Sequence, residues 1–348
     1  MDMQIAVCYA PHDLRIERRA VEPLAPDEVL VKVGYCGVCP WDVRVYAGRS
    51  SSVRFPLFMG HEVSGVVEAV GSGVTSVSPG QRVAVDVIRR CGQCPACRRG
   101  MENHCQKADY SRGGYAEYLA ALATNVYPIR SDTSMVEAAL AEPLACVVRA
   151  QNRLAASPGD LALVMGAGPL GLLHLQVLKS RGARVLVCDP VDERLVMARR
   201  LGAAAGLNPT YDDLSRAVDA YTDGRGVDVA VIATSTLEAA RQALPLLGAN
   251  GRLLLFGGIH PKADWALDPN LIHYREIWIT GSSDYTPAEF AAALRLIEDG
   301  VLTLRPLISH VYPLAKLPEA LDALEQHAGL KVVVRCNDLE PFEPEVQP

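Results

Sequence analysis

The residues best suited to chemistry in this sequence are four cysteines in one short stretch, CGQCPACRRGMENHC. They are Cys91, Cys94, Cys97 and Cys105. Four thiolates at this spacing suit a tetrahedral zinc ion, and the Gly and Pro between them allow the backbone to wrap around it. Disulfides or unrelated buried thiols are the alternative, but the spacing is typical of zinc sites. Four protein ligands would close the site, so we expect a structural zinc ion here.

A glycine-rich segment predicts a dinucleotide-binding turn. Residues 166–171 read GAGPLG and fit G-x-G-x-x-G, with Gly166, Gly168 and Gly171 at the glycine positions and Pro169 and Leu170 before the last. The first glycine permits a tight turn, the second lets the backbone approach a pyrophosphate, and the third allows close helix–strand packing. The N-terminus of the following helix offers free N–H groups to the phosphates.

An acidic residue follows this turn at the spacing that dinucleotide-binding folds use. Asp189 ends the next apolar run, about 18 residues beyond the turn, where a carboxylate hydrogen-bonds the adenosine ribose hydroxyls. A carboxylate there repels a 2′-phosphate, so the sequence favours NAD over NADP. Asp189 could instead be a turn residue before Pro190. Arg194 could lie against the adenine or be a solvated helix residue.

A second metal site can be assembled from residues of different segments. Cys39 lies in CGVCPWD, His61 and Glu62 follow in FMGHEVSG, and Glu142 lies in AEPLAC. A thiolate, an imidazole and one or two carboxylates could form an open zinc site with room for a substrate oxygen. From spacing alone, His61 or Glu142 could equally be an ordinary polar residue.

The elements that position these residues change in character along the chain. In the first third, residues 29–39, 63–74 and 81–88 are valine-rich and bounded by turn residues, which predicts a β-rich domain. From about residue 160, short apolar strands alternate with helices. The predicted strands and helices are, in chain order, 161–168, 169–182, 183–189, 193–203, 227–235, 238–249 and 251–258. This alternation indicates βαβ units with a parallel sheet, and a last helix at 288–300 precedes a closing strand at 330–336.

The composition limits the class of protein. A chain of 348 residues with 49% hydrophobic and 21% charged residues predicts a globular protein of two domains. The net charge of −6 argues against a nucleic-acid partner, and no segment approaches the roughly 20 apolar residues that cross a bilayer. The N-terminus does not resemble a signal peptide. Ten cysteines in that context indicate metal binding in a reducing cytoplasm.

These motifs, in this order, resemble the zinc-containing medium-chain dehydrogenase/reductase family, specifically its polyol branch of sorbitol, threonine and related dehydrogenases. The resemblance covers almost the whole chain and includes GYCGVCPWD, GHEVSGVVEAVGSGVTSVSPGQRVAV, the four-cysteine lobe, AEPLACVVRA, GAGPLG and GLKVVVRC. It implies a GroES-like catalytic domain, residues 1–149 and 286–348 with a zinc lobe at about 88–108. A Rossmann NAD-binding domain, residues 150–285, is inserted between its two parts.

The resemblance also assigns the residues of the catalytic site. It implies that Cys39 and His61 are ligands of a catalytic zinc ion, whereas Cys36 is a neighbouring non-ligand. Glu62 and Glu142 would be carboxylates at the metal, either as direct ligands or holding the bound water. With the four-cysteine site, this makes two zinc ions per chain.

Two positions depart from the family. Where most relatives have Ser or Thr, whose hydroxyl touches the substrate oxygen, this chain has Trp41, and where many have His it has Arg44. Proton transfer would therefore run through the zinc-bound water with Glu62 or Glu142. Trp41 could line the pocket, since an indole face suits the C–H face of a sugar or cyclitol ring, or it could turn away and fill a gap.

We therefore expect an NAD- and zinc-dependent dehydrogenase that interconverts a secondary alcohol and its ketone. The expected substrate is a polyol, sugar, cyclitol or amino alcohol. The resemblance and an exposed sheet edge expected after residues 251–258 suggest a homodimer or homotetramer. A specialised biosynthetic dehydrogenase of an aminocyclitol or another ring intermediate is one alternative, and a non-catalytic nucleotide-binding member of the family is the other.

Overall fold

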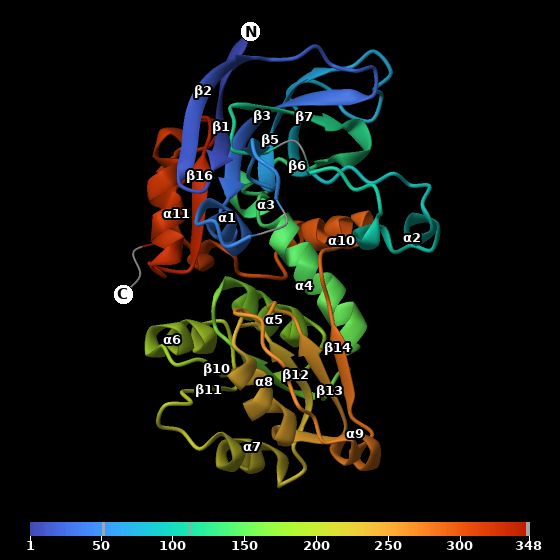
Figure 1. Ribbon diagram of the computed structural model, residues 1–348, viewed down its shortest axis with the longest axis vertical. Coiled ribbons are helices and arrows are strands. Elements are labelled where there is room, and N and C mark those ends of the chain that lie inside the picture. The colour runs from blue at the N-terminus through green and yellow to red at the C-terminus, as the bar shows by residue number, and fades with distance from the viewer. Residues whose placement is uncertain (51–52, 111–112, 346–348) are drawn as a thin grey trace. The chain divides into compact units, whose positions relative to one another are not determined.

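The computed structural model describes residues 1–50, 53–110 and 113–345. The chain divides into two compact units, one formed by residues 1–145 with 285–348 and the other by residues 146–284. The sequence places the same two divisions at 149/150 and 285/286. In Figure 1 the blue N-terminal and red C-terminal parts of the chain belong to the same unit.

The first unit is built on two β-sheets. Its larger sheet has the strand order β15-β16-β3-β5-β6-β8, with β7 also paired to β3, and a smaller sheet has the order β2-β1-β4. The strands are β1 (Asp2–Ala10), β2 (Asp13–Ala20), β3 (Glu28–Gly37), β4 (Leu57–Phe58), β5 (Glu62–Val70), β6 (Arg82–Asp86), β7 (Tyr118–Leu122), β8 (Val126–Pro128), β15 (Ile308–Pro313) and β16 (Lys331–Arg335). The helices are α1 (Pro40–Tyr46), α2 (Pro95–Arg98), α3 (Met135–Ala138), α10 (Pro287–Glu298) and α11 (Leu317–Glu325), and α4 (Ala141–Leu154) begins in this unit.

The register of this sheet brings three distant segments together at one place. β3 pairs antiparallel with β16 on one side and with β5 on the other. Gly37, the last residue of β3, is opposite Val333 of β16 and Glu62 of β5. The first residues of β5 and β16 therefore lie near the end of β3, where the chain turns into α1.

The second unit is a parallel sheet flanked by helices. Its strand order, β11-β10-β9-β12-β13-β14, is that of a doubly wound dinucleotide-binding fold, and every pair is parallel. Its elements are β9 (Leu161–Met165), α5 (Pro169–Ser180), β10 (Arg184–Cys188), α6 (Asp192–Arg200), β11 (Ala205–Leu207), α7 (Leu214–Thr222), β12 (Val227–Ile232), α8 (Leu237–Ala243), β13 (Leu247–Leu255), α9 (Pro269–Arg275) and β14 (Trp278–Gly281). All five residues of β9 are buried, as expected for a central strand covered on both faces.

The core of the second unit contains a histidine that should make stability depend on pH. His174 of α5 is fully buried, its Nδ1 lies 2.7 Å from Nε2 of Gln151, and its ring packs edge-on against Phe256. Burial lowers the pKa of His174 to about 3, so the folded chain keeps this imidazole neutral. The unfolded chain binds a proton near pH 6.5. The stability that neutral His174 contributes is therefore present above that pH and is lost as the pH falls toward 3.

We expect His174→Gln to flatten the acid side of the stability profile. In the wild type, protonation of His174 in the unfolded chain lowers the free energy of unfolding by at most about 1.4 kcal/mol per pH unit below pH 6.5. Urea unfolding at pH 7 and pH 5 measures the difference, with the exposed His273→Gln as the matched control. Equal pH dependence in wild type and His174→Gln would contradict this assignment.

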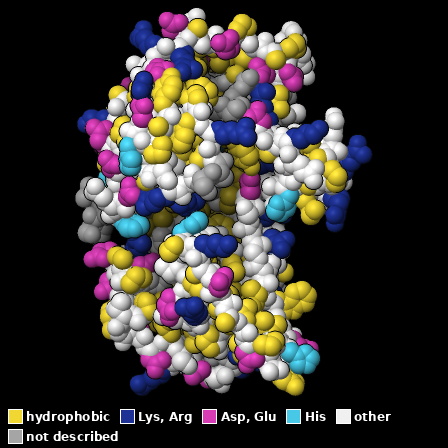
Figure 2. All heavy atoms as spheres, viewed as in Figure 1, with side chains coloured by type: hydrophobic (Ala, Val, Ile, Leu, Met, Phe, Trp, Pro, Cys, Tyr) yellow, Lys and Arg dark blue, Asp and Glu magenta, His cyan; other side chains and the backbone are white. Residues whose placement is uncertain are grey.

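The surface is mixed in charge. On the face shown in Figure 2, Lys and Arg side chains are interspersed with Asp and Glu. Across the described ranges, none of the helices combines the length and the apolar character that crossing a membrane requires.

Candidate functional site

The structure brings together three of the four residues predicted at the catalytic metal, all in the first unit. One ligand atom each of Cys39, His61 and Glu62 lies within 4.8 Å of the others. Cys39 precedes α1, and His61 directly precedes β5. Because Glu62 is opposite Gly37 at the end of β3, the antiparallel pairing of β3 with β5 carries His61 toward Cys39.

Cys39 is held at the start of a helix. Its Sγ accepts a hydrogen bond from the N–H of Trp41 at 3.5 Å, and its own N–H donates to Oδ2 of Asp42 at 3.1 Å. Burial raises the pKa of Cys39 to about 12, and the charges of Glu62 and Asp42 add to the effect. The thiolate that this position requires in a metal site must therefore be stabilised by a cation.

His61 is oriented by a buried carboxylate. Its Nδ1 lies 3.7 Å from Oδ1 of Asp42, an oxygen that is buried and has no hydrogen-bond partner among the described residues. The other oxygen of Asp42 accepts a hydrogen bond from the hydroxyl of Tyr115 at 2.9 Å. Burial alone would lower the pKa of His61, but the charges of Asp42, Glu142 and Glu62 outweigh it and raise that pKa. A carboxylate beside Nδ1 leaves Nε2 as the metal-binding nitrogen.

Glu62 has an ionic partner that the sequence did not predict. Lys331, the first residue of β16, donates a hydrogen bond to Oε1 of Glu62 at 2.6 Å and to the carbonyl oxygen of Val38 at 2.9 Å. Both side chains are buried. Burial would lower the pKa of Lys331, but the charges of Glu62 and Cys39 raise it, so the group stays an ammonium. A lysine directly before three consecutive valines was the available signal.

Glu142 and Trp41 are the other two residues predicted at the catalytic site. Glu142, the second residue of α4, is not in the group of three, but its negative charge raises the pKa of both His61 and Lys331. The indole of Trp41 lies edge-to-face against the ring of His61, with ring centres 5.9 Å apart. Trp41 therefore lies beside a predicted ligand. Arg44 is half-buried in the last turn of α1.

These residues fit a zinc ion. Their donors, a thiolate, an imidazole and carboxylates, are the set found in catalytic zinc sites that keep one position open. One buried oxygen beside this cluster, Oδ1 of Asp42, lacks a hydrogen-bond partner among the described residues. An unpaired buried carboxylate oxygen is costly, and positive charge on His61 and a bound cation would compensate it.

The four cysteines of the lobe also form one cluster. The Sγ atoms of Cys91, Cys94, Cys97 and Cys105 all lie within 4.8 Å of one another. The Cys94–Cys97 and Cys91–Cys105 separations are both 3.5 Å, and Cys91–Cys97 is 4.0 Å. A tetrahedral zinc ion with Zn–S bonds of about 2.3 Å needs separations of about 3.8 Å. Backbone N–H groups, foremost that of Cys97, lower the pKa of Cys94 to about 6, which favours its thiolate.

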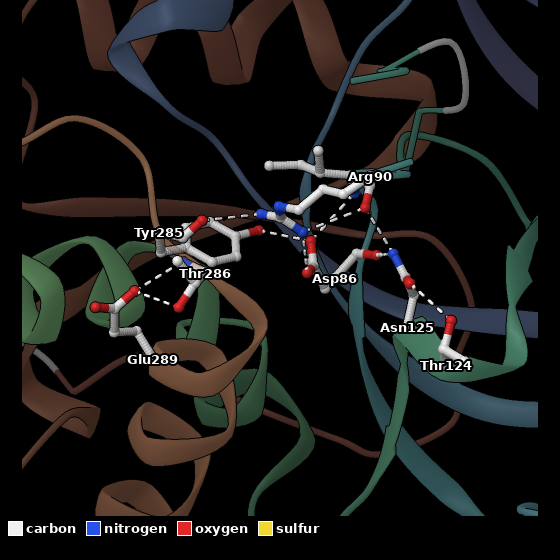
Figure 3. A network of polar contacts seen from close by, with 8 residues as sticks. Asp86, Arg90, Thr124, Asn125, Tyr285, Thr286 and Glu289 are labelled. Carbon is white, nitrogen blue, oxygen red and sulfur yellow. Dashed lines mark hydrogen bonds and ion pairs between the residues drawn. The ribbon is translucent and has the colours of Figure 1, made fainter. Parts of the chain in front are cut away.

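A buried polar network anchors the base of this lobe (Figure 3). Arg90 binds Oδ2 of Asp86 at 2.5 Å and donates to the carbonyl oxygen of Tyr285 at 3.1 Å, and its guanidinium lies 5.0 Å from the centre of the Tyr285 ring. The hydroxyl of Tyr285 donates to Asp86 at 3.0 Å, and the amide of Asn125 donates to the backbone of Asp86 and Ile88. The cysteine loop is thereby fixed to the segment that leads into α10.

The glycine-rich turn of the second unit has the geometry expected of a phosphate-binding turn. Gly166 has a φ of 106°, and a Cβ on Gly171 would lie 1.9 Å from the carbonyl oxygen of Gly166. A Cβ on Gly168 would meet nothing within 4 Å, so the backbone there is open to a ligand. Pro169 and Leu170 form the first turn of α5.

Asp189 lies directly beside this turn. Its Oδ2 accepts the N–H of Ala167 at 2.7 Å, and its Oδ1 accepts the N–H of Val191 at 2.9 Å. Arg194 approaches to 3.9 Å from Oδ2. The carboxylate is thus fixed at the end of β10, where a dinucleotide fold binds the ribose.

The chain matches two domain families. It matches the alcohol dehydrogenase GroES-like domain over residues 25–131 and the zinc-binding dehydrogenase over residues 169–299. It is 33% identical to 2-dehydro-3-deoxy-L-galactonate 5-dehydrogenase of Pseudoalteromonas atlantica, over 92% of this chain and 95% of that protein. It is 32% identical to D-arabitol-phosphate dehydrogenase of Enterococcus avium, over 92% of this chain and 93% of that protein.

Solved structures agree with these matches. A zinc-binding dehydrogenase from Sinorhizobium meliloti 1021 bound to NADP has a TM-score of 0.91 at 26% identity and covers 97% of this chain and 100% of its own. A short chain alcohol dehydrogenase from Escherichia coli CFT073 in complex with NADH has a TM-score of 0.89 at 28% identity and covers 96% of this chain and 99% of its own.

Fold, site and matches define a dehydrogenase built from a GroES-like domain and a Rossmann domain. The chain belongs to the zinc-containing medium-chain dehydrogenase/reductase family, in its polyol branch. The predictions of fold class, of oxidoreductase activity and of zinc and a nicotinamide dinucleotide as cofactors are confirmed. Sequence reasoning missed Lys331, Asp42 and Gly37, the residues that position Glu62 and His61.

Proposed function

We propose that this protein oxidises a secondary alcohol of the polyol, sugar or cyclitol class to its ketone, with NAD as the cofactor, and reduces the ketone in reverse. The observation that carries this proposal is the meeting of Cys39, His61 and Glu62 beside Trp41. The named relatives act on sugar acids and polyol phosphates, which supports the substrate class. NAD-linked turnover of zinc-replete protein across simple alcohols, acyclic polyols, sugars, cyclitols and amino alcohols tests this proposal.

Cys39 and His61 would hold the catalytic zinc ion, and Glu62 and Glu142 would supply carboxylates beside it. When bound, zinc lends Lewis acidity to the substrate hydroxyl and NAD accepts the hydride. Asp42 keeps the ring of His61 in place. Because Trp41 replaces the usual hydroxyl residue, the departing proton has only the carboxylates of Glu62 and Glu142 among the named site residues to accept it.

The preference for NAD rests on Asp189. Its two oxygens are fixed by the N–H groups of Ala167 and Val191, so the carboxylate cannot swing away from a 2′-phosphate. Repulsion of that phosphate by a buried negative charge disfavours NADP. One similar structure holds NADP and another holds NADH, so the proposed preference of this chain rests on its own residues.

Trp41 should decide which substrates are accepted. Its indole lies against His61 and offers an apolar face, which favours a ring-bearing substrate such as an aminocyclitol over an acyclic polyol. We expect Trp41→Thr, which restores a hydroxyl and removes the ring, to raise kcat/KM for acyclic polyols about tenfold and lower it for cyclitols. Trp41→Phe keeps an aromatic face and should retain the wild-type order. A kcat/KM that changes in the same direction for acyclic polyols and for cyclitols would contradict this role of Trp41.

A second copy of the chain would pair along the edge of the Rossmann sheet. β14 is the outermost strand, and Trp278 on it and Tyr274 on α9 expose 71% and 79% of their surface. Exposed aromatic residues beside an unpaired edge strand favour strand-to-strand association. We expect a homodimer or homotetramer in sedimentation, and Trp278→Glu to shift it toward the monomer. Val196→Glu, at an exposed position on α6, should leave the assembly intact. A Trp278→Glu variant that sediments like the wild type would contradict the interface.

We place the protein in a reducing cytoplasm. All ten cysteines are free thiols, and five of them lie in the two predicted metal sites. Thiols in such sites need reducing conditions to stay available for zinc.

A further inference from the structure

Arg44 carries a charge near the predicted catalytic site that no acidic side chain balances. It is half-buried in the last turn of α1. Among the described residues, its guanidinium has neither an ion pair nor a hydrogen-bond partner. A guanidinium that has lost part of its water is costly to leave unpaired, because it presents five N–H donors. This position therefore suits an anionic group on a bound molecule.

Two acidic residues on the helices around Arg44 have other partners. Asp42, the one acidic residue of α1, accepts a hydrogen bond from the hydroxyl of Tyr115 at 2.9 Å. On α11, which packs against α1, Glu325 pairs with Arg49 at 2.5 Å. Arg44 is thus left out of the polar contacts that tie α1 to its surroundings.

Arg44 lies on the same face of α1 as Trp41. The two residues are three positions apart, so their side chains are neighbours on the helix surface. Both are partly exposed, whereas the opposite face of α1 is buried. The ring of Trp41 lies against His61, with ring centres 5.9 Å apart, and Arg44 follows Trp41 about 4.5 Å farther along the helix axis. This open face of α1 leads from the predicted ligand His61 past an indole to a free cation.

The charge of the site makes a cation at this position consequential. Asp42, Glu62 and Glu142 act on His61 through their negative charges, which raise the pKa of that imidazole. An anionic substrate meets repulsion from these carboxylates, and a cation on the open face of α1 offsets it. The planar fork of Arg44 also matches two oxygens of a carboxylate or a phosphate at once.

We propose that Arg44 is a specificity-determining residue that binds an anionic group, a carboxylate or a phosphate, at the end of the substrate away from the reacting carbon. In this arrangement the reacting hydroxyl is at the metal beside His61, and the ring of Trp41 lines the path to Arg44. The inference rests on the proposed function and narrows its substrate class. Within the polyols, sugars and cyclitols, it selects acidic or phosphorylated members over neutral ones.

Kinetics with a matched set of substrates test this role. The set contains a hexitol, the hexonate and the hexitol phosphate of the same configuration, each measured at saturating NAD and across the hexitol configurations. We expect the wild type to prefer one of the two anions to the neutral hexitol at least about tenfold in kcat/KM, and the preferred arm tells carboxylate from phosphate. Arg44→Met should remove that preference and leave kcat/KM for the hexitol within about threefold of wild type.

Two further variants separate the guanidinium from general damage to α1. Arg44→Lys keeps the charge without the fork, so it should retain part of the preference for the anion. Arg49→Met, which removes an exposed arginine already paired with Glu325, is the matched control and should keep the full preference. A loss in Arg49→Met equal to that in Arg44→Met would overturn the assignment.

The outcomes distinguish this inference from the proposed function. An equal loss for the hexitol and both anions in Arg44→Met, with a raised KM for NAD, would show that Arg44 contacts the cofactor and would overturn the inference alone. A wild type that prefers the neutral hexitol would do the same. If the wild type turns over none of the three, the proposed function fails for this substrate class. Isothermal titration of NAD-loaded protein with the hexonate and the hexitol phosphate then decides the role of Arg44: binding that Arg44→Met weakens at least about tenfold supports it, and equal or absent binding overturns it.

Discussion

Cys39→Ala is expected to remove one of two zinc ions per chain and to lower kcat by about 10³-fold or more, because metal polarisation of a substrate oxygen is worth several kcal/mol. Burial raises the pKa of Cys39 to about 12 even though the ammonium of Lys331 opposes the increase, so the ionised thiol needs a bound cation. Without the thiolate, His61 and the carboxylates would be left to hold the ion. Zinc is counted by atomic emission after gel filtration, and turnover is followed by NADH absorbance.

Cys36→Ala is the matched control for this prediction. Cys36 is also buried and lies three positions earlier, but it is not in the cluster formed by Cys39, His61 and Glu62. It should keep both zinc ions and turnover close to that of wild type. Two zinc ions in Cys39→Ala, or one in Cys36→Ala, would show that the ligand has been assigned to the wrong cysteine.

Cys97→Ser is expected to empty the four-cysteine site and to lower the thermal midpoint by about 10 °C. Loss of about 3–4 kcal/mol of metal-linked stability produces a change of this size in a unit of about 200 residues. Cys97 is buried among the other three thiols, and its replacement leaves the remaining negative charges without a complete zinc shell. Differential scanning calorimetry of the zinc-loaded protein measures the shift.

The control for the lobe is Cys336→Ser, which removes a thiol of the same unit that lies outside both clusters. A serine hydroxyl can replace the contact from the Cys336 thiol to the carbonyl oxygen of Gly114. Zinc content and thermal midpoint should therefore change little. A midpoint for Cys97→Ser equal to that of Cys336→Ser would exclude a stabilising metal ion at the lobe.

The parts of the structure that the sequence predicted well are those that depend on short spacings. The four cysteines, the GAGPLG turn and Asp189 each lie within one local segment, and their geometry follows from a single loop or one strand–helix unit. The alternation of apolar strands and helices after residue 160 likewise predicted a parallel sheet.

The parts that could not be predicted depend on strand register between distant segments. Lys331 meets Glu62 only because β16 and β5 pair with the same end of β3, and no pattern within residues 330–336 reveals that register. The same holds for Asp42, whose residue type was visible but whose contact with His61 depends on the turn after β3. The orientation of Trp41 was open in the sequence for this reason, and the structure places its ring against His61.

The most direct test of the central claim is NAD-linked turnover of zinc-replete protein across simple alcohols, acyclic polyols, sugars, cyclitols and amino alcohols. The same panel is repeated with NADP and after a chelator has removed the zinc ion expected at Cys39 and His61. We predict that the protein turns over one class of secondary alcohol with NAD. Turnover with NADP should be at least about tenfold weaker, and turnover with NAD should be lost when the zinc content falls from two ions per chain to one. NADH binding without turnover of any substrate class, or activity that survives removal of the zinc, would contradict a zinc-dependent dehydrogenase.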